Sequence, residues 1–249
     1  MHTFVLIHGA GSTAWYWHLV APRLQAAGHD VVVPELPADD DTAGLAEYTD
    51  VVVEAIGDRG SRGDLVLVAQ SMAGFTAPLV CDRVPVAQMI LVAAMVPAPG
   101  ESPGEWWADT AHAEARAALV ADLARAGVDY DPDDEVATFL HDVPPDVVAE
   151  SVDHIRPQSG TPFVAPWPRD GWPDVPTDFV LCRDDRFFPA EFQRRVVRDR
   201  LGIVPVEMDG GHLPALARPA ELSDLLLSLA AARPVAAPAS GPAPGRSPA

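Results

Sequence analysis

Ser71 is a residue whose surroundings could support covalent chemistry. It follows the largely apolar run 64–68, typical of a strand buried on both faces, and precedes a segment with the apolar spacing of a helix. A serine on a tight turn between strand and helix can act as a nucleophile, and the motif typical of that turn is G-x-S-x-G. Here Ala69 and Ala73 occupy the two glycine positions, and Gly74 follows one position late. The motif alone therefore leaves open whether Ser71 is a nucleophile or a structural serine.

The partners that a nucleophilic serine needs occur further along the chain. A hydroxyl requires a neighbouring base, a group that orients the base, and donors for the developing oxyanion. The run R-D-D-R-F-F-P offers Asp184 and Asp185, and the run D-G-G-H-L-P offers His212, each directly after an expected strand. The order serine, acid, histidine at strand ends is the order expected for this chemistry. We therefore predict Ser71 as nucleophile, His212 as base and one of the two aspartates as the acid.

A loop of small residues after the first expected strand could supply the oxyanion donors. Residues 8–13 read H-G-A-G-S-T, so a backbone N–H there can approach Ser71. The N–H groups of Ala10 and Met72 together would make a two-donor oxyanion hole. We expect His8, which lies in the same loop, to brace the loop by hydrogen bonding rather than to take part in catalysis.

The elements that must position these residues follow from the apolar pattern. Short apolar strands alternate with helical patterns, which is typical of a parallel sheet with helices on its faces. The expected strands are 3–7, 30–33, 64–68, 88–94, 177–182 and 204–208. The expected helices between them are 17–27, 45–56 with Thr42 as its cap, 72–83, 190–201 and 219–231.

The alternation stops in the middle of the chain. Between residues 97 and 176 only helical fragments occur, at 114–125, 135–141 and 147–155. We predict a core of residues 1–96 and 177–232 and a helical insertion at 97–176, which is well placed to be a lid because it follows the end of a buried strand. Residues 233–249 are rich in proline and alanine, and we expect them to be disordered.

Composition limits the class of protein. A chain of 249 residues fits one large α/β domain with an insertion. The formal net charge of −19 argues against nucleic acid and anionic membranes as partners. The N-terminal run M-H-T-F-V-L-I-H-G lacks the features of a signal peptide, so we expect a cytoplasmic protein. The aspartates at 39–41 are interpreted as a solvated turn, and neither a metal nor a cofactor is predicted.

Several longer stretches carry a family resemblance. These are FVLIHGAGSTAWYWHLVAPRLQAAGHDVVVPEL, LVAQSMAGF, CRDDRFFPAEFQRRVV and MDGGHLPALARPAEL. Over residues 3–231 the chain resembles the α/β-hydrolase superfamily, and it is most similar to the branch of plant methylesterases and hydroxynitrile lyases and to their actinobacterial relatives. The resemblance implies an α/β-hydrolase fold, with a mostly parallel central sheet, helices on both faces and a helical lid after the sixth strand. In that family the acid lies four residues before the proline of D-x-x-x-P, which selects Asp185, paired with Pro189. The family's oxyanion positions fall on Ala10 and Met72.

The tryptophans indicate the kind of substrate. All six lie either just after the 8–13 loop or in the insertion, around the expected cleft, which points to an apolar or aromatic group in the substrate. The expected pocket residues are Gly9, Ser12, Trp15, Trp106, Trp107, Phe163, Trp167 and Leu213. We expect a serine hydrolase that cleaves a small, mostly apolar or aromatic carboxylic ester, or a lactone, through an acyl-enzyme on Ser71. The sequence leaves open whether the protein forms a homodimer.

Two other functions remain open on the same scaffold. A hydroxynitrile lyase is disfavoured, because the similar lyases carry a threonine at the place of Gly9 and a lysine where this chain has Leu213. The other alternative is a non-hydrolytic protein of a biosynthetic pathway, either a ligand-binding protein or a tailoring protein that cyclises an intermediate. An intact set of Ser71, Asp185 and His212 makes a pure binding protein less expected.

Overall fold

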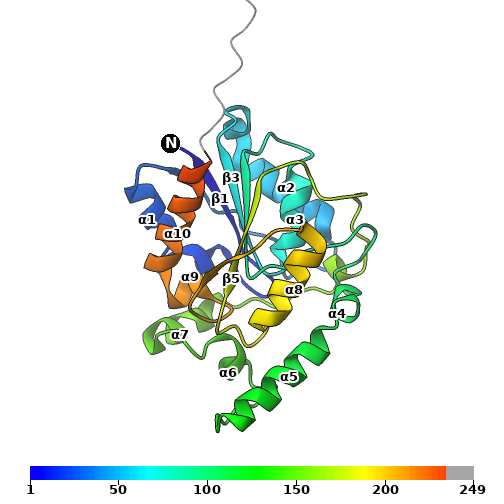
Figure 1. The fold of residues 1–249 in the computed structure, drawn as a ribbon. Helices are drawn as coiled ribbons and strands as arrows, with labels where there is room; N and C mark the ends of the chain where they lie inside the picture. Colours follow the sequence, from blue (N-terminus) through cyan, green and yellow to red (C-terminus); the bar gives the residue numbers. More distant parts are fainter. Residues whose placement is uncertain (234–249) are drawn as a thin grey trace, which may run out of the picture.

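A parallel sheet forms the centre of the computed structural model, which describes residues 1–233 (Figure 1). Within these residues six strands pair in the order β2-β1-β3-β4-β5-β6, and every pairing is parallel. The strands are β1 (Thr3–Ile7), β2 (Asp30–Val32), β3 (Leu65–Gln70), β4 (Gln88–Val92), β5 (Thr177–Cys182) and β6 (Val206–Met208). The carboxyl ends of parallel strands meet at one edge of the sheet, so residues that follow different strands come together there.

Helices cover both faces of the sheet, as the alternation predicts. Figure 1 shows α1 (Ala21–Ala26) and α10 (Pro219–Ala232) on one side and α2 (Leu45–Ile56), α3 (Ala73–Val80) and α8 (Ala190–Leu201) on the other. Successive residues of a strand point to opposite faces. In β1, Phe4 and Leu6 therefore join the apolar core under α1 and α10, and Val5 and Ile7 join the core under α2, α3 and α8.

The insertion lies between β4 and β5. Residues 93–176, all of which the structure describes, contain no strand. Their α-helices are α4 (Trp106–Asp109), α5 (His112–Arg125), α6 (Glu135–Phe139) and α7 (Pro145–Ser151), and Figure 1 shows them gathered beyond one end of the sheet. The insertion thus follows the fourth strand of this chain, and the count of six was wrong. Four strands, β1 to β4, precede the insertion in the chain, and the other two, β5 and β6, follow it.

The cap of one helix and the extent of another differ from the expectation. The Thr42 hydroxyl donates to the Asp40 carboxylate at 2.6 Å, so it does not cap α2 as expected. Instead, α2 begins after Gly44, whose N–H donates to the Glu47 carboxylate at 2.8 Å. The expected helix 17–27 is divided into a 3₁₀ turn, Ala14–Trp17, and α1.

Two further findings concern the C-terminal tail and membrane-spanning helices. The tail predicted to be disordered lies, apart from Arg233, outside the described residues. In the part of the chain that the structure describes, no helix has the length and apolar character needed to span a membrane.

Candidate active site

Ser71 occupies a strained turn between β3 and α3. Its φ of 53° lies in the left-handed region, which costs a non-glycine residue about 1–3 kcal/mol. Two backbone hydrogen bonds hold the turn against the end of β4: Ser71 N–H donates to the Val92 carbonyl at 3.3 Å, and Met95 N–H donates to the Ser71 carbonyl at 2.9 Å. The strain is therefore maintained by contacts to a neighbouring strand.

The glycine that this turn requires is Gly74. A Cβ at Gly74 would lie 1.9 Å from the carbonyl oxygen of Met95, because α3 packs directly on the backbone that follows β4. The alanines at positions 69 and 73 are buried within the same core. The departure from G-x-S-x-G is thus compatible with the turn, since the close backbone approach falls one residue later.

His212 connects Ser71 to a carboxylate. Its Nε2 lies 3.0 Å from Ser71 Oγ, and its Nδ1 lies 2.8 Å from Asp185 Oδ2. An ionised carboxylate only accepts hydrogen bonds, so Nδ1 carries the hydrogen and Nε2 is left to accept the hydroxyl hydrogen of Ser71. All three residues are buried. The structure therefore brings together the three side chains that the sequence singled out.

Asp185, and not Asp184, faces His212. The other carboxylate oxygen of Asp185, Oδ1, accepts the N–H groups of Phe187 and Phe188, both at 2.8 Å. Asp184 points elsewhere and accepts the Gly210 N–H at 2.9 Å. Backbone donors compensate the buried charge of Asp185 and fix its orientation toward the imidazole.

The 8–13 loop lies against the Ser71 turn. A Cβ at Gly9 would come within 2.8 Å of Ser71 Cβ and 2.4 Å of Gln70 Oε1, so only glycine fits there without a shift. Among the described residues, the N–H groups of Ala10 and Met72 donate to no protein acceptor. Both N–H groups are therefore available to an acceptor from outside the protein.

His8 braces this loop from within. Leu36 N–H donates to His8 Nε2 at 3.1 Å, which leaves the hydrogen on Nδ1 to donate to the Gly9 carbonyl at 2.9 Å. Burial lowers the pKa of His8, while the Gly9 carbonyl opposes that shift. The imidazole is thus kept neutral, as its two partners require.

The sequence patterns did not predict three polar residues that contact the site. Gln70 donates from Nε2 to the His212 carbonyl at 3.1 Å, and its position at the end of an otherwise apolar strand was an available signal. Asp142 Oδ2 accepts the Gly211 N–H at 2.7 Å, and Gln158 Oε1 accepts the Gly11 N–H at 3.0 Å. These two bonds span 69 and 147 residues, and no local pattern predicts them.

Aromatic rings surround His212. Ring centroids of Phe139 in α6, Phe187 and Phe188 lie 5.5, 5.1 and 4.9 Å from that of the imidazole. The ring of Trp107 lies 5.7 Å from that of Phe187. The insertion thus contributes apolar surface next to the histidine.

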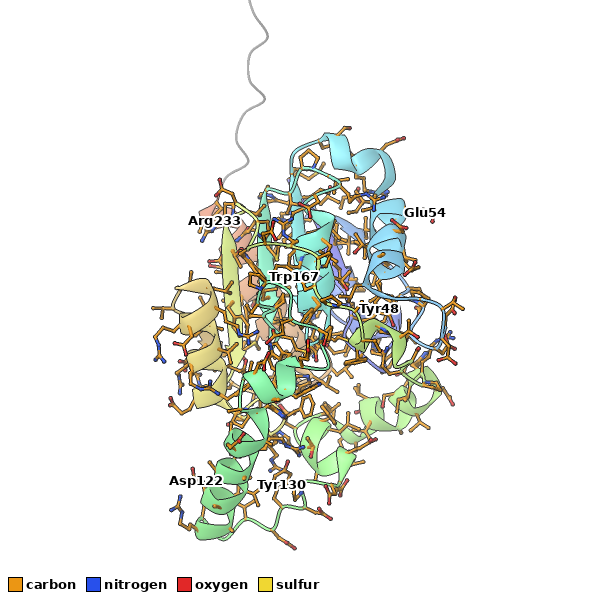
Figure 2. All side chains as sticks on the ribbon, turned by 90° about the vertical axis from the view of Figure 1, so that its right-hand side faces the viewer. Tyr48, Glu54, Asp122, Tyr130, Trp167 and Arg233 are labelled. Carbon is orange, nitrogen blue, oxygen red and sulfur yellow. The ribbon has the colours of Figure 1, made fainter. Side chains whose placement is uncertain are left out.

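Two of the expected pocket residues belong to the core instead. Trp106 is 0% exposed and donates from Nε1 to the Val96 carbonyl, and Trp167 is 2% exposed and donates to the Phe75 carbonyl. Figure 2 shows Trp167 within the body of the protein. The prediction that these two residues line the pocket was wrong, because their side chains pack between the insertion and the sheet domain.

Of the remaining expected pocket residues, Gly9 is buried and the others are partly exposed. Gly9 lies beside Ser71, as described above. Trp15 stacks between His18 and His154, at 4.1 and 4.6 Å, and no contact links it to Ser71 in the described part of the chain. The other members of the set are half-buried, and they are Ser12, Trp107, Phe163 and Leu213.

A buried Ser-His-Asp arrangement at the carboxyl edge of a parallel sheet is the arrangement expected of an α/β-hydrolase. Comparison with known proteins agrees: residues 4–225 match the alpha/beta hydrolase family, and the chain belongs to that family.

The relatives cover nearly the whole chain. Methylesterase 7 of Arabidopsis thaliana is 28% identical, over 91% of this chain and 95% of the relative. Methylesterase 9 of the same plant is 25% identical, over 92% and 98%. A solved structure, the pyrethroid hydrolase from Sphingobium faniae JZ-2, shares the fold with a TM-score of 0.72, 24% identity and coverage of 93% and 98%.

Proposed function

We propose that the protein is a serine esterase that hydrolyses a small, mostly apolar carboxylic ester or a lactone. The observation that carries this proposal is the continuous hydrogen-bonded connection from Ser71 through His212 to Asp185. The methylesterase relatives support a carboxylic ester hydrolase as the general activity. Beyond this general activity, we propose the class of ester and the formation of an acyl-enzyme on Ser71.

In the first half of the proposed reaction, Ser71 Oγ attacks the ester carbonyl carbon. His212 Nε2 takes the hydroxyl proton, and Asp185 stabilises the resulting imidazolium through Nδ1. The carbonyl oxygen becomes an oxyanion, which the N–H groups of Ala10 and Met72 bind. When the tetrahedral intermediate collapses, the C–O bond to the alcohol breaks, and His212 gives its proton to the leaving alkoxide.

In the second half, water releases the acyl group. His212 Nε2 removes a proton from water, whose oxygen attacks the acyl carbon, and the same two N–H groups bind the second oxyanion. The bond from Ser71 Oγ to the acyl carbon then breaks, and the proton returns to Ser71. The products are a carboxylic acid and an alcohol, and every proton is accounted for by His212 and water.

Residues 97–176 would serve as a lid in this reaction. The Phe139 ring, contributed by α6, lies 5.5 Å from the His212 ring, so the insertion reaches the base directly. Such a cover excludes water and strengthens the interactions of the charges beneath it. The aromatic rings around His212 support an apolar or aromatic acyl or alcohol group in the substrate.

The lyase alternative fits this site less well. A threonine at position 9 would place its Cβ 2.8 Å from Ser71 Cβ, which demands a movement of the turn itself. The position after the base is Leu213, which carries no charge to stabilise a departing cyanide. Ester hydrolysis requires neither a threonine at position 9 nor a positive charge at position 213.

The test is labelling with a fluorophosphonate, followed by peptide mapping. We expect an adduct on Ser71 that disappears in His212→Ala, and the same His212→Ala protein should lack activity against a panel of short esters and lactones. Well-folded wild-type protein that forms no adduct and cleaves no ester would refute the proposal. Cyanide release from an aromatic cyanohydrin would favour the lyase.

A further inference from the structure

Both loops that would carry the reaction are bonded to the insertion. The 209–213 loop presents His212, and the 8–13 loop presents the Ala10 N–H. Each loop donates one backbone N–H to an insertion side chain: Gly211 to Asp142, and Gly11 to Gln158. Gly211 directly precedes His212, and Gly11 directly follows Ala10. The two bonds therefore act one residue from the groups that would react.

The two glycines before His212 leave room for the insertion. A Cβ at Gly211 would lie 2.7 Å from Asp142 Oδ1 and 2.8 Å from His141 Nε2. A Cβ at Gly210 would come within 3.2 Å of Asp142 Oδ2, and the φ of Gly210 is +115°, which a residue with a side chain rarely adopts. The loop is thus shaped for close contact with residues 141 and 142.

The contact at the other loop is equally direct. Gly11 N–H donates to Gln158 Oε1 at 3.0 Å, and the Gly11 carbonyl accepts the Arg156 N–H at 3.4 Å. The Gln158 amide is oriented in turn, because its Nε2 donates to the Tyr48 hydroxyl at 3.1 Å. The insertion therefore holds both backbone polar groups of Gly11.

We infer that Asp142 and Gln158 are positioning residues, which hold the base and the oxyanion donor in reactive geometry only while the insertion is docked. This inference rests on the proposed function. Neither side chain touches the reacting atoms. Opening of the insertion to admit substrate would break both bonds, so the open form would bind substrate but lack an aligned base and donor.

The test compares variants in steady-state hydrolysis of a p-nitrophenyl ester. Misplacement of a catalytic group by about 1 Å can cost about 100-fold in rate. We therefore expect Asp142→Ala and Gln158→Met each to lower kcat by about 10-fold to 100-fold. KM should stay close to the wild-type value, because the lost interactions act on the transition state.

Two further variants separate positioning from general loosening. Asp142→Asn keeps an oxygen acceptor for the Gly211 N–H, and it should recover most of the lost kcat. Thr161→Val removes a different hydrogen bond between the insertion and the core: the Thr161 hydroxyl donates to the Asp41 carbonyl at 2.6 Å. In this variant kcat should stay at the wild-type value.

Three outcomes would overturn the inference. Unchanged kcat in both Asp142→Ala and Gln158→Met would do so, as would an equal loss of kcat in Thr161→Val. If wild-type protein itself neither labels with fluorophosphonate nor cleaves the ester, the proposed function fails and the inference fails with it. Normal wild-type activity with unaffected variants removes the inference alone.

Discussion

Gly74→Ala should damage both the stability and the activity of this protein. The new Cβ would lie 1.9 Å from the Met95 carbonyl oxygen, whereas real Cβ atoms essentially never come within 3.0 Å of another atom. The backbone around Met95 must therefore move away by about 1 Å. That backbone also donates the Met95 N–H to the Ser71 carbonyl, so the movement is transmitted to the nucleophile.

The magnitudes follow from this displacement. Overpacking of a close-packed core costs about 1–3 kcal/mol. For a chain of this size, each kcal/mol lowers Tm by about 2–4 °C. A shift of about 1 Å at Ser71 should also reduce kcat by about 100-fold. We expect the loss of kcat at temperatures far below Tm, where the variant is fully folded.

Ala73→Gly is the matched control for this prediction. It restores the glycine of G-x-S-x-G but removes a methyl group from the first position of α3, which should cost no more than about 1 kcal/mol. Thermal unfolding and ester hydrolysis are to be measured for both variants. Wild-type kcat and Tm in Gly74→Ala, or equal losses in the two variants, would refute the reasoning.

Two further predictions concern the ion pair that anchors the insertion and the brace of the 8–13 loop. Arg200→Met leaves the Glu101 carboxylate, 4% exposed, without its partner and should cost about 3–5 kcal/mol of unfolding free energy. Arg83→Met, which breaks an exposed pair with Asp50, should cost less than about 1 kcal/mol, and similar losses in urea denaturation would contradict the argument. Burial lowers the pKa of His8, so the unfolded chain binds a proton more readily and stability should fall as pH drops below about 6.5. Denaturation between about pH 7.5 and 5.5 should show a shallower decline in His8→Gln, and an unchanged slope would count against a neutral His8 brace.

Local patterns in the sequence determined most of the fold. The bounds of α2 and β5 were predicted to the residue, because apolar periodicity reflects which side of an element faces the core. The cap of α2 was wrong, since Thr42 bonds to its neighbour Asp40 and the choice between such alternatives depends on the path of the loop. The order of serine, acid and histidine at strand ends also predicted which side chains meet, because parallel strands end at one edge.

Contacts made by the insertion were decided only in three dimensions. Trp106 and Trp167 were expected in the pocket, and they lie in the core instead. The Trp106 ring packs against Phe188 and Phe192, and the Trp167 N–H donates to the Phe75 carbonyl, so both depend on partners far away in the chain. The bonds from Asp142 and Gln158 likewise join residues that no periodic pattern relates.

The sequence by itself thus determined the sheet, its helices and the residues that meet at its carboxyl edge. Each of these follows from interactions within a few residues or from the common direction of the strands. The tertiary structure decided that Gly74 is the required glycine of the Ser71 turn and that the insertion bonds to both active-site loops. Both results depend on the close approach of segments distant in the chain, and the physical reason is that such packing leaves no trace in local composition.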